Sequence, residues 1–267
     1  MTASIPPILL VGFGKMGGAM LAGWRERGLA PSIAIDPSLP ASPGPGVTVL
    51  ADAAAIPPGF TPAAVVLAVK PQSADAALPL YARYAGSAVL LSIMAGRTIT
   101  GLRRLLGERA AIVRAMPNTP AAVRQGITVA CPGPGVTAAQ RGLCDDLLAA
   151  IGKVAWVEDE ALIDPVTAVS GGGPAYVFLL AELLEQAAIE QGIPAELARL
   201  MARQTVSGSG ALLAASTEDA ATLRRNVTSP KGTTERALAV LMEQSAWPDA
   251  ISRAIAAATA RSRELAG

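Results

Sequence analysis

The chain has 267 residues, of which 51% are hydrophobic and 16% charged, so it can bury one large or two ordinary domains and is not a disordered chain. Its formal net charge of +1, with no basic stripe along the sequence, excludes a nucleic-acid partner held by electrostatics. Histidine is absent, which excludes histidine triads, histidine metal sites and imidazole proton relays. We therefore expect a small-molecule partner and no metal site.

The cysteine count and the chain start bear on the compartment. Cys131 and Cys144 are the two cysteines of a long chain, which argues against a disulfide framework and for buried thiols in a reducing compartment. Residues 1–7 carry no basic segment of the kind that begins a signal peptide. No apolar stretch reaches the ~20 residues of a membrane span without a proline, glycine or charge. The sequence predicts a cytoplasmic protein that does not associate with a membrane.

The first predicted strand leads into a glycine-rich loop. Residues 8–11 form a short apolar run, the motif Gly12-Phe13-Gly14-Lys15-Met16-Gly17-Gly18 follows, and a helix is predicted over residues 19–28. This is the G-x-G-x-x-G pattern with a strand before it and a helix after it. Such glycines allow a tight turn, close backbone approach to a pyrophosphate and close packing of helix on strand. We expect a dinucleotide at this loop.

The second predicted strand, residues 32–35, ends at an acid. Asp36 lies 24 residues after Gly12, the spacing at which such folds bind the adenine ribose 2′-hydroxyl. An Asp-Pro turn is an equally good interpretation of Asp36-Pro37. Residues 37–43 contain no arginine or lysine to bind a 2′-phosphate. If Asp36 faces the ribose, it favours NADH over NADPH.

The alternation of apolar runs and helical patterns continues to about residue 157. We expect further strands over residues 47–50, 63–69, 88–93, 111–115, 127–131 and 154–157, and helices over 73–84, 98–106 and 137–151. This order is typical of a doubly wound α/β sheet. Lys70 ends the most apolar run, either at the ligand edge of the sheet or as a solvated strand cap.

Strand signals stop after residue 157, so we place a domain boundary at residue 160. The Rossmann-type domain then covers residues 1–160, and an all-α domain covers residues 161–267. Helices are predicted over 175–191, 195–214 and after Pro230. They are apolar on more than one face, which leaves surface that one small domain cannot bury. We expect that surface to form a homodimer.

Two polar or glycine-rich segments interrupt the helical domain. The first, Ser170-Gly171-Gly172-Gly173-Pro174, is costly inside a helix, because glycine costs ~1 and proline ~3 kcal/mol there relative to alanine. It is either a linker or, because apolar residues flank it, a tightly packed glycine surface. The second runs from Asn226 to Thr234, where Ser229 before Pro230 has the pattern of a helix N-cap. An ordinary capped helix explains that pair but not Gly232-Thr233-Thr234, which we interpret as an anion site for a carboxylate.

Five motifs together resemble one family of enzymes. They are Gly12-Phe13-Gly14-Lys15-Met16, Ala68-Val69-Lys70-Pro71, Met116-Pro117-Asn118-Thr119-Pro120, Ser170-Gly171-Gly172-Gly173-Pro174-Ala175-Tyr176 and Val227-Thr228-Ser229-Pro230-Lys231-Gly232-Thr233-Thr234. Their order and spacing resemble those of pyrroline-5-carboxylate reductase. The resemblance implies a Rossmann domain, a helical dimerisation domain that can assemble further, and reduction of 1-pyrroline-5-carboxylate to L-proline with NAD(P)H.

The resemblance also implies roles for individual residues. Thr234 becomes the candidate catalytic residue, at the nitrogen or carboxylate of the cyclic imino acid. The substrate-binding candidates are Ser229, Lys231, Gly232, Thr233, Thr234, Gly171, Gly172 and Gly173. The cofactor-binding candidates are Gly12, Phe13, Gly14, Lys15, Met16, Gly17, Asp36, Val69, Lys70, Pro71, Ala95, Asn118 and Asn226. Four positions depart from the family pattern. Family members usually have alanine near Gly17, serine in place of Gly172, glycine in place of Lys231, and an asparagine after the third strand, where this chain has Asp52-Ala53. Of these, Lys231 bears on the charge of the substrate site.

The resemblance accounts for the absence of histidine. A cyclic imine that is already protonated gains a hydride without an acid from the protein, so positioning becomes the main task. Two alternatives share the fold. A 3-hydroxyacid dehydrogenase needs a lysine on the interdomain helix, and residues 171–191 contain none. A non-enzymatic nucleotide sensor would form no proline.

Overall fold

The structure is a computed structural model that describes residues 5–38 and 44–266. By contacts the chain divides into two compact units. Unit 1 comprises Met1–Gly171 together with Ala258–Gly267, and unit 2 is Gly172–Ala257.

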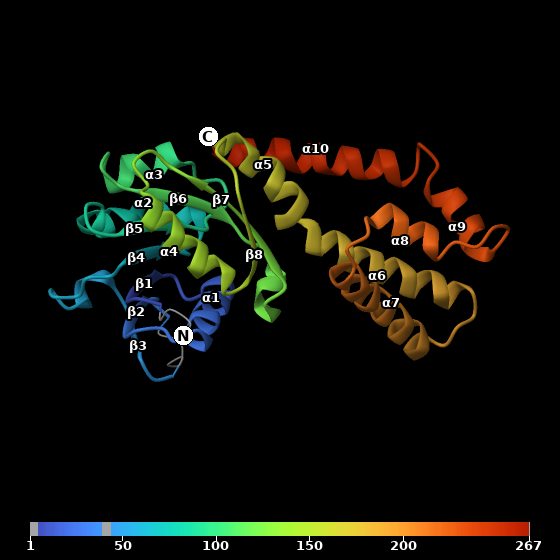
Figure 1. Ribbon diagram of the computed structural model, residues 1–267, viewed down its shortest axis with the longest axis horizontal. Helices are drawn as coiled ribbons and strands as arrows, with labels where there is room; N and C mark the ends of the chain where they lie inside the picture. Colours follow the sequence, from blue (N-terminus) through green and yellow to red (C-terminus); the bar gives the residue numbers. More distant parts are fainter. Residues whose placement is uncertain (1–4, 39–43, 267) are drawn as a thin grey trace. The chain divides into compact units, whose positions relative to one another are not determined.

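Unit 1 is built on an eight-stranded sheet in the order β3-β2-β1-β4-β5-β6-β7-β8 (Figure 1). The strands are β1 Ile8–Val11, β2 Ser32–Ile35, β3 Val47–Leu50, β4 Ala64–Leu67, β5 Val89–Ser92, β6 Ile112–Met116, β7 Gly126–Pro132 and β8 Gly152–Trp156. The first six strands run parallel. They have the order of a doubly wound dinucleotide-binding sheet, with the switch point between β1 and β4. The predicted α/β fold is confirmed.

The central strands are apolar throughout because both faces of the sheet are covered. Alternate residues point to opposite faces, so Leu9 and Val11 belong to one core, whereas Ile8 and Leu10 belong to the other. Helix α1 (Lys15–Glu26) and helix α4 (Ala138–Ala149) cover the second face, joined by a hydrogen bond from Trp24 Nε1 to the Leu147 carbonyl. Helix α3 (Ile99–Leu106) contributes to the first core.

The seventh strand departs from the parallel pattern. β7 pairs antiparallel with β6, with Met116 opposite Val129, and β8 then pairs parallel with β7. Only the short η4 turn, Thr119–Val123, separates β6 from β7. A parallel crossover needs a dozen or more residues, so this connection forces the reversal.

The helix predicted over residues 73–84 is wrong in type. The structure has a 3₁₀ turn at Pro71–Ser73, a four-residue α-helix α2 at Ala74–Ala77, and 3₁₀ helix at Leu78–Tyr84. Pro79 lies inside this run and has no N–H to donate to the preceding turn. The apolar periodicity is nevertheless retained, because Ala74, Leu78 and Tyr81 are all buried in the first core.

Unit 2 is entirely helical where the structure describes it. Helices α6 (Gly173–Glu190) and α7 (Ala195–Ala215) pack side by side and share the ion pair Arg199–Glu185 at 3.0 Å (Figure 1). Helix α8 (Ala220–Asn226), which the sequence did not indicate, and helix α9 (Thr233–Leu241) follow. Helix α10 (Trp247–Ala266) begins in unit 2, and its last turns belong to unit 1.

The glycine-rich segment is helical rather than a linker. After α5 (Ile163–Val166), residues Thr167–Gly171 form a π-helical turn, and α6 begins at Gly173. A Cβ on Gly171 would lie 3.2 Å from Met116 Cε, whereas a Cβ on Gly173 would meet nothing within 4 Å. The expected tight glycine packing therefore occurs at Gly171 and not at Gly173.

The division between the units falls later than the boundary expected at residue 160. Helix α5 packs on β6 and β7, and Ile163 is buried in the first core of the sheet. The end of α10 also joins unit 1, where the Ser262 hydroxyl donates to Asp164 Oδ1 at 2.7 Å. Unit 1 is therefore assembled from two separate stretches of the chain.

Candidate cofactor and substrate sites

The loop between β1 and α1 has the geometry of a phosphate-binding turn. Gly12 has φ +97°, and a Cβ placed there would lie 2.6 Å from the carbonyl oxygen of Ala68. Gly14 is the N-cap of α1 and carries no side-chain cap, so the first N–H groups of the helix are not capped by a side chain. A Cβ on Gly17 would collide with the Gly12 carbonyl, so the position accepts glycine without a shift of the loop. Lys15 and Met16 lie in the first turn.

The acid at the end of β2 lies beside this loop. One carboxylate oxygen of Asp36 accepts from the Phe13 N–H at 2.9 Å, and the other accepts from the Ser38 N–H at 2.9 Å and the Ser38 hydroxyl at 2.5 Å. Partial burial would raise the pKa of Asp36, but the hydrogen bonds from Ser38 and Phe13 outweigh it and hold the pKa below its ordinary value. Asp36 is therefore ionised at neutral pH.

Asp36 thus serves both as a turn residue and as a brace for the glycine loop. The turn interpretation is supported by Ser38, and the bond to Phe13 places the carboxylate at the loop that we assign to the pyrophosphate. Residues 39–43, on which part of the cofactor argument rested, lie outside the described residues.

A cavity of about 340 Å³ lies at the carboxyl ends of β1, β2 and β4. Its lining includes Gly12, Gly14, Asp36, Val69 and Lys70, which brings five predicted cofactor residues together. Leu80 and Tyr81 also line it, and the sequence did not single them out. Their apolar periodicity in residues 73–84 was the one available signal. This edge is where doubly wound sheets bind dinucleotides.

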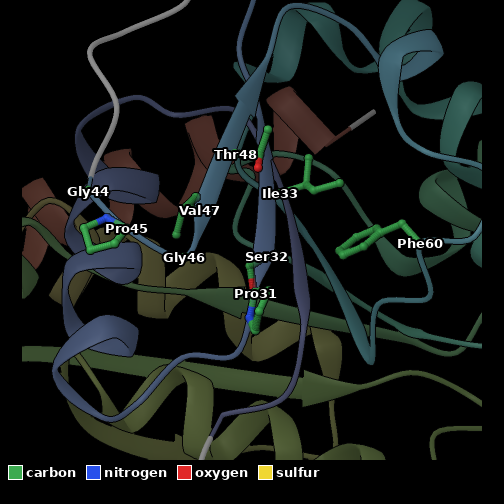
Figure 2. A pocket seen from close by; sticks show the side chains of 9 residues that line it. All are labelled: Pro31, Ser32, Ile33, Gly44, Pro45, Gly46, Val47, Thr48 and Phe60. Carbon is green, nitrogen blue, oxygen red and sulfur yellow. The ribbon is translucent and has the colours of Figure 1, made fainter.

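A second hollow, of about 610 Å³, lies at the opposite end of the strands (Figure 2). Ser32 and Val47 are the first residues of β2 and β3, so this hollow opens at their amino ends. None of its nine described lining residues has an ionisable side chain. We do not assign a site there, because ligands of such sheets bind beyond the carboxyl ends of the strands.

The other predicted cofactor residues follow neighbouring strands at the carboxyl edge. Pro71 begins a 3₁₀ turn, and its carbonyl accepts from Arg97, which also pairs with Asp75 at 2.9 Å. Ala95 is exposed in the loop after β5. Asn118 is buried in the loop after β6. Its side-chain amide accepts a hydrogen bond from the Ile127 N–H and donates one to the Ser170 carbonyl.

In unit 2 the predicted N-cap at Ser229 is wrong. Helix α9 begins at Thr233 with Gly232 as its N-cap, three residues later than expected. Lys231 has φ +60°, a left-handed conformation that ends any helix there, and the Gly232 N–H donates to the Ser229 carbonyl at 3.0 Å. The carboxylate of Glu235 reaches back to accept the Lys231 N–H at 2.5 Å.

The predicted substrate residues of unit 2 are held on this turn. Thr233 and Thr234 occupy the first two positions of α9 and are exposed in the single chain. Neither hydroxyl has a hydrogen-bond partner within the described part of the chain. A left-handed Lys231 also explains why glycine is usual there, since glycine adopts that conformation without cost. Asn226, predicted near the cofactor, donates its amide to Glu218 at 3.0 Å.

Other chemistries find no support among the described residues. Burial raises the pKa of Cys131 to about 11 and that of Cys144 to about 12, so both thiols stay protonated. Both are buried, as expected. No group of three or more His, Cys, Asp or Glu side chains that could hold a metal ion occurs in residues 5–38 and 44–266.

Unit 1 contains a buried ionic cluster that the sequence analysis did not predict. Arg114 on β6 is 2% exposed and pairs with Glu160 at 2.9 Å and Asp164 at 3.7 Å. Glu160 also accepts the Ile99 N–H at 2.8 Å, and Asp164 accepts the Ser262 hydroxyl. The only signal was an arginine inside an otherwise apolar strand.

Fold and site together define a class. A doubly wound sheet with a phosphate-binding glycine loop, an acid after β2 and a following all-helical unit is the architecture of a nicotinamide-dependent oxidoreductase.

Comparison with known proteins identifies the family within that class. The sequence model of a family described as "Pyrroline-5-carboxylate reductase dimerisation" matches residues 160–265. The chain is 36% identical to the pyrroline-5-carboxylate reductase of Pseudomonas aeruginosa, over 98% of both chains. The structure of the Coxiella burnetii pyrroline-5-carboxylate reductase matches with a TM-score of 0.89 and 32% identity over 100% of both chains. The Plasmodium falciparum enzyme with NADP bound matches with a TM-score of 0.84 and 28% identity over 98% of both chains. The chain belongs to the pyrroline-5-carboxylate reductase family.

Proposed function

We propose that this chain carries out the reaction of its family, the reduction of 1-pyrroline-5-carboxylate to L-proline with a hydride from NAD(P)H. The observation that carries the proposal is the identity of 36% with a curated reductase over nearly the whole of both chains. The glycine loop, the cavity at the carboxyl edge and the free hydroxyls of Thr233 and Thr234 support it.

The residues of unit 1 fit a dinucleotide. Gly12 leaves no room for a side chain against Ala68, and the uncapped N–H groups at the start of α1 suit a pyrophosphate. Asp36 and Lys70 line the cavity beside this loop. We propose that the following residues of unit 1 contribute to cofactor binding: Gly12, Phe13, Gly14, Lys15, Met16, Gly17, Asp36, Val69, Lys70, Pro71 and Ala95. We propose the same role for Asn226 of unit 2. When bound, the reduced nicotinamide supplies the hydride.

The protein's remaining task is to bind and orient the substrate. A protonated cyclic imine is neutralised at nitrogen when its carbon gains a hydride, so no proton has to come from the protein in that step. We propose that the turn Ser229–Thr233 holds the substrate carboxylate, with Lys231 adding a positive charge. Thr234 then hydrogen-bonds the substrate, and Gly171, Gly172 and Gly173 shape the space around it. Orientation of this kind lowers the barrier without acid catalysis.

Replacing Thr234 by alanine tests the substrate site. Deleting one partner of a polar contact costs ~1–3 kcal/mol, so kcat/KM for pyrroline-5-carboxylate should fall about 5- to 150-fold. Cofactor affinity should stay nearly unchanged, because Thr234 is proposed to contact the substrate and not the cofactor. Steady-state kinetics and cofactor titration measure both. The matched control is Thr228→Ala, which removes a threonine hydroxyl from the same segment. Because the Thr228 hydroxyl already donates to the Arg224 carbonyl, this variant should keep the wild-type kcat/KM. Wild-type kinetics for Thr234→Ala would remove Thr234 from the site.

We further propose that NADH is used more efficiently than NADPH. The ionised Asp36 carboxylate at the end of β2 would repel a ribose 2′-phosphate, with an effect on the order of 1 kcal/mol near the surface. Asp36→Ser should therefore shift the ratio of kcat/KM values about 5-fold toward NADPH.

The Ser38 position gives a control for this change. Ser38→Ala removes a hydrogen bond to Asp36 but leaves its charge, so the cofactor ratio should hold. A wild type that prefers NADPH, or an Asp36→Ser variant with the wild-type ratio, would reduce Asp36 to a brace for the loop.

The exposed apolar side chains of unit 2 support assembly with a second copy. Phe178, Leu183, Leu200 and Leu212 are all more than half exposed in the single chain. The match to a dimerisation family over residues 160–265 agrees with homo-oligomerisation. We propose an obligate homodimer through the helical unit, which can assemble further. Sedimentation at micromolar concentration should show no monomer, and a monomeric species would refute the dimer.

We also propose that the protein is cytoplasmic. The described residues contain one helical stretch, Glu160–Glu190, that is long and apolar enough to cross a membrane by length and composition. Its apolar surface is explained by a second protein copy. Fractionation should place the protein with the soluble material.

A further inference from the structure

We infer that Asn118 is a positioning residue. Its side chain holds the backbone of Ser170 and Gly171, where the glycine-rich segment begins, and it is not a ligand of the cofactor. The inference rests on the proposed reductase function and assigns Asn118 a different task within it. Its basis is the way both halves of the amide are used inside unit 1.

The first half of the amide extends the β6–β7 ladder. Met116 lies opposite Val129, so the same antiparallel register places Asn118 opposite Ile127. Asn118 is extended, with φ −130° and ψ 166°, and its Oδ1 accepts the Ile127 N–H at 2.9 Å. The side chain thus supplies the bond that the backbone would make if the ladder continued.

The second half supplies a donor that the helix lacks. Asn118 Nδ2 donates to the Ser170 carbonyl at 3.1 Å. In an α-helix that carbonyl would accept from residue 174, but Pro174 has no N–H. In a π-helix it would accept from Ala175, whose N–H instead donates to the Gly172 carbonyl at 3.0 Å. The Asn118 amide therefore replaces a missing backbone donor.

A third contact lies next to these two. Gly171 packs closely on Met116, where a Cβ would lie 3.2 Å from the methionine methyl. Two successive residues are therefore held at the end of β6: Asn118 in the following loop binds the Ser170 carbonyl, and Met116, the last residue of β6, packs against Gly171. Asn118 is only 9% exposed, so the bonds are shielded from water.

The contacts of Asn118 and Met116 with Ser170 and Gly171, which we call the clamp, lie near the proposed cofactor site. β6 runs parallel to β5, so Asn118 follows its strand at the edge of the sheet that also carries Ala95 and Lys70. A dinucleotide bound at a switch point extends across both halves of that edge. Asn118 therefore sets where the backbone of Ser170 and Gly171 lies relative to that edge.

The variant Asn118→Asp separates the two bonds. A carboxylate still accepts the Ile127 N–H but cannot donate to Ser170. We expect kcat to fall about 10- to 100-fold through misplacement, while the dissociation constant for the cofactor changes less than about 2-fold. Lowering the pH should restore part of the activity relative to wild type at the same pH, because a protonated carboxyl donates again. Asn118→Leu, which has similar volume and no polar atoms, should show the same loss without that recovery.

Hydrogen exchange gives a readout that does not depend on activity. In Asn118→Asp the Ile127 amide should stay protected, while exchange quickens in the amides of residues 167–173. In Asn118→Leu both should exchange faster. If wild type fails to reduce pyrroline-5-carboxylate, the proposed function fails, but this exchange pattern still tests the clamp.

Three outcomes would overturn the inference. A rise in the cofactor dissociation constant with kcat unchanged would make Asn118 a cofactor ligand. Wild-type kinetics in a folded Asn118→Asp variant would leave it a purely structural residue. An unchanged exchange rate at residues 167–173 in both variants would show that the amide does not hold the segment.

Discussion

Replacing Gly12 by alanine is expected to weaken dinucleotide binding about 100-fold, equivalent to ~2.7 kcal/mol. The residue has φ +97°, which costs a side chain ~1–2 kcal/mol, and the new Cβ would lie 2.6 Å from the Ala68 carbonyl oxygen. Because Ala68 is backbone at the end of β4, the loop itself must move. Titration of the purified protein with NADH and with NADPH measures the loss.

Two other glycines provide matched controls for this result. A Cβ on Gly14 meets nothing within 4 Å, so Gly14→Ala should leave stability unchanged and weaken only cofactor binding. A Cβ on Gly18 would lie 3.6 Å from the Phe13 ring, an ordinary contact, so Gly18→Ala should leave cofactor binding unchanged. Because Gly18 lies within helix α1, the substitution should raise stability by up to ~1 kcal/mol. Equal cofactor affinity in Gly12→Ala and Gly18→Ala would contradict the assignment of the loop.

Replacing Arg114 by leucine is expected to destabilise the protein by ~3–5 kcal/mol, the usual cost of removing one partner of a buried ion pair. Glu160 and Asp164 would lose their positive partner inside unit 1. Urea denaturation at one fixed protein concentration is the measurement, because assembly makes stability depend on concentration.

An exposed ion pair in the same unit gives the comparison. Arg261 pairs with Glu264 at 2.7 Å, and both side chains are well exposed, so Arg261→Leu should cost less than ~1 kcal/mol. Combining Arg114→Leu with Glu160→Gln and Asp164→Asn should recover part of the loss, since no unpaired charge then stays buried. A loss for Arg114→Leu no larger than that for Arg261→Leu would mean that the cluster does not stabilise unit 1.

The parts of the fold that the sequence predicted well are those determined by local pattern. The strands at residues 8–11, 32–35 and 47–50 have the predicted bounds, and the helix predicted over residues 137–151 is present as α4. These features depend on residues adjacent in sequence, where apolar runs and cap residues are visible directly. Of the five predicted cofactor residues that line one cavity, Asp36 was singled out by its spacing from Gly12, and the other four lie in the family motifs.

The features of the fold and site that the sequence did not predict depend on contacts between distant residues or on the backbone conformation of a single residue. The N-cap of α9 is Gly232 and not the predicted Ser229, because Lys231 adopts a left-handed conformation. A lysine in the sequence does not indicate such a conformation. The pairing of Arg114 with Glu160 and Asp164 joins segments far apart in sequence. The role of the Asn118 amide could be recognised only when its partners were located.

The return of the last ten residues to unit 1 has a consequence for synthesis. The segment after residue 257 is translated after all of unit 2, yet it belongs to the unit that begins with β1, and Ser262 donates a hydrogen bond to Asp164. A nascent chain can form the sheet early, but unit 1 stays unfinished until this segment has left the ribosome. Premature termination shortly before Ser262 would therefore release a chain in which Asp164 keeps Arg114 but loses its Ser262 hydrogen bond, and cellular proteases should clear such products faster than chains that include residues 258–266.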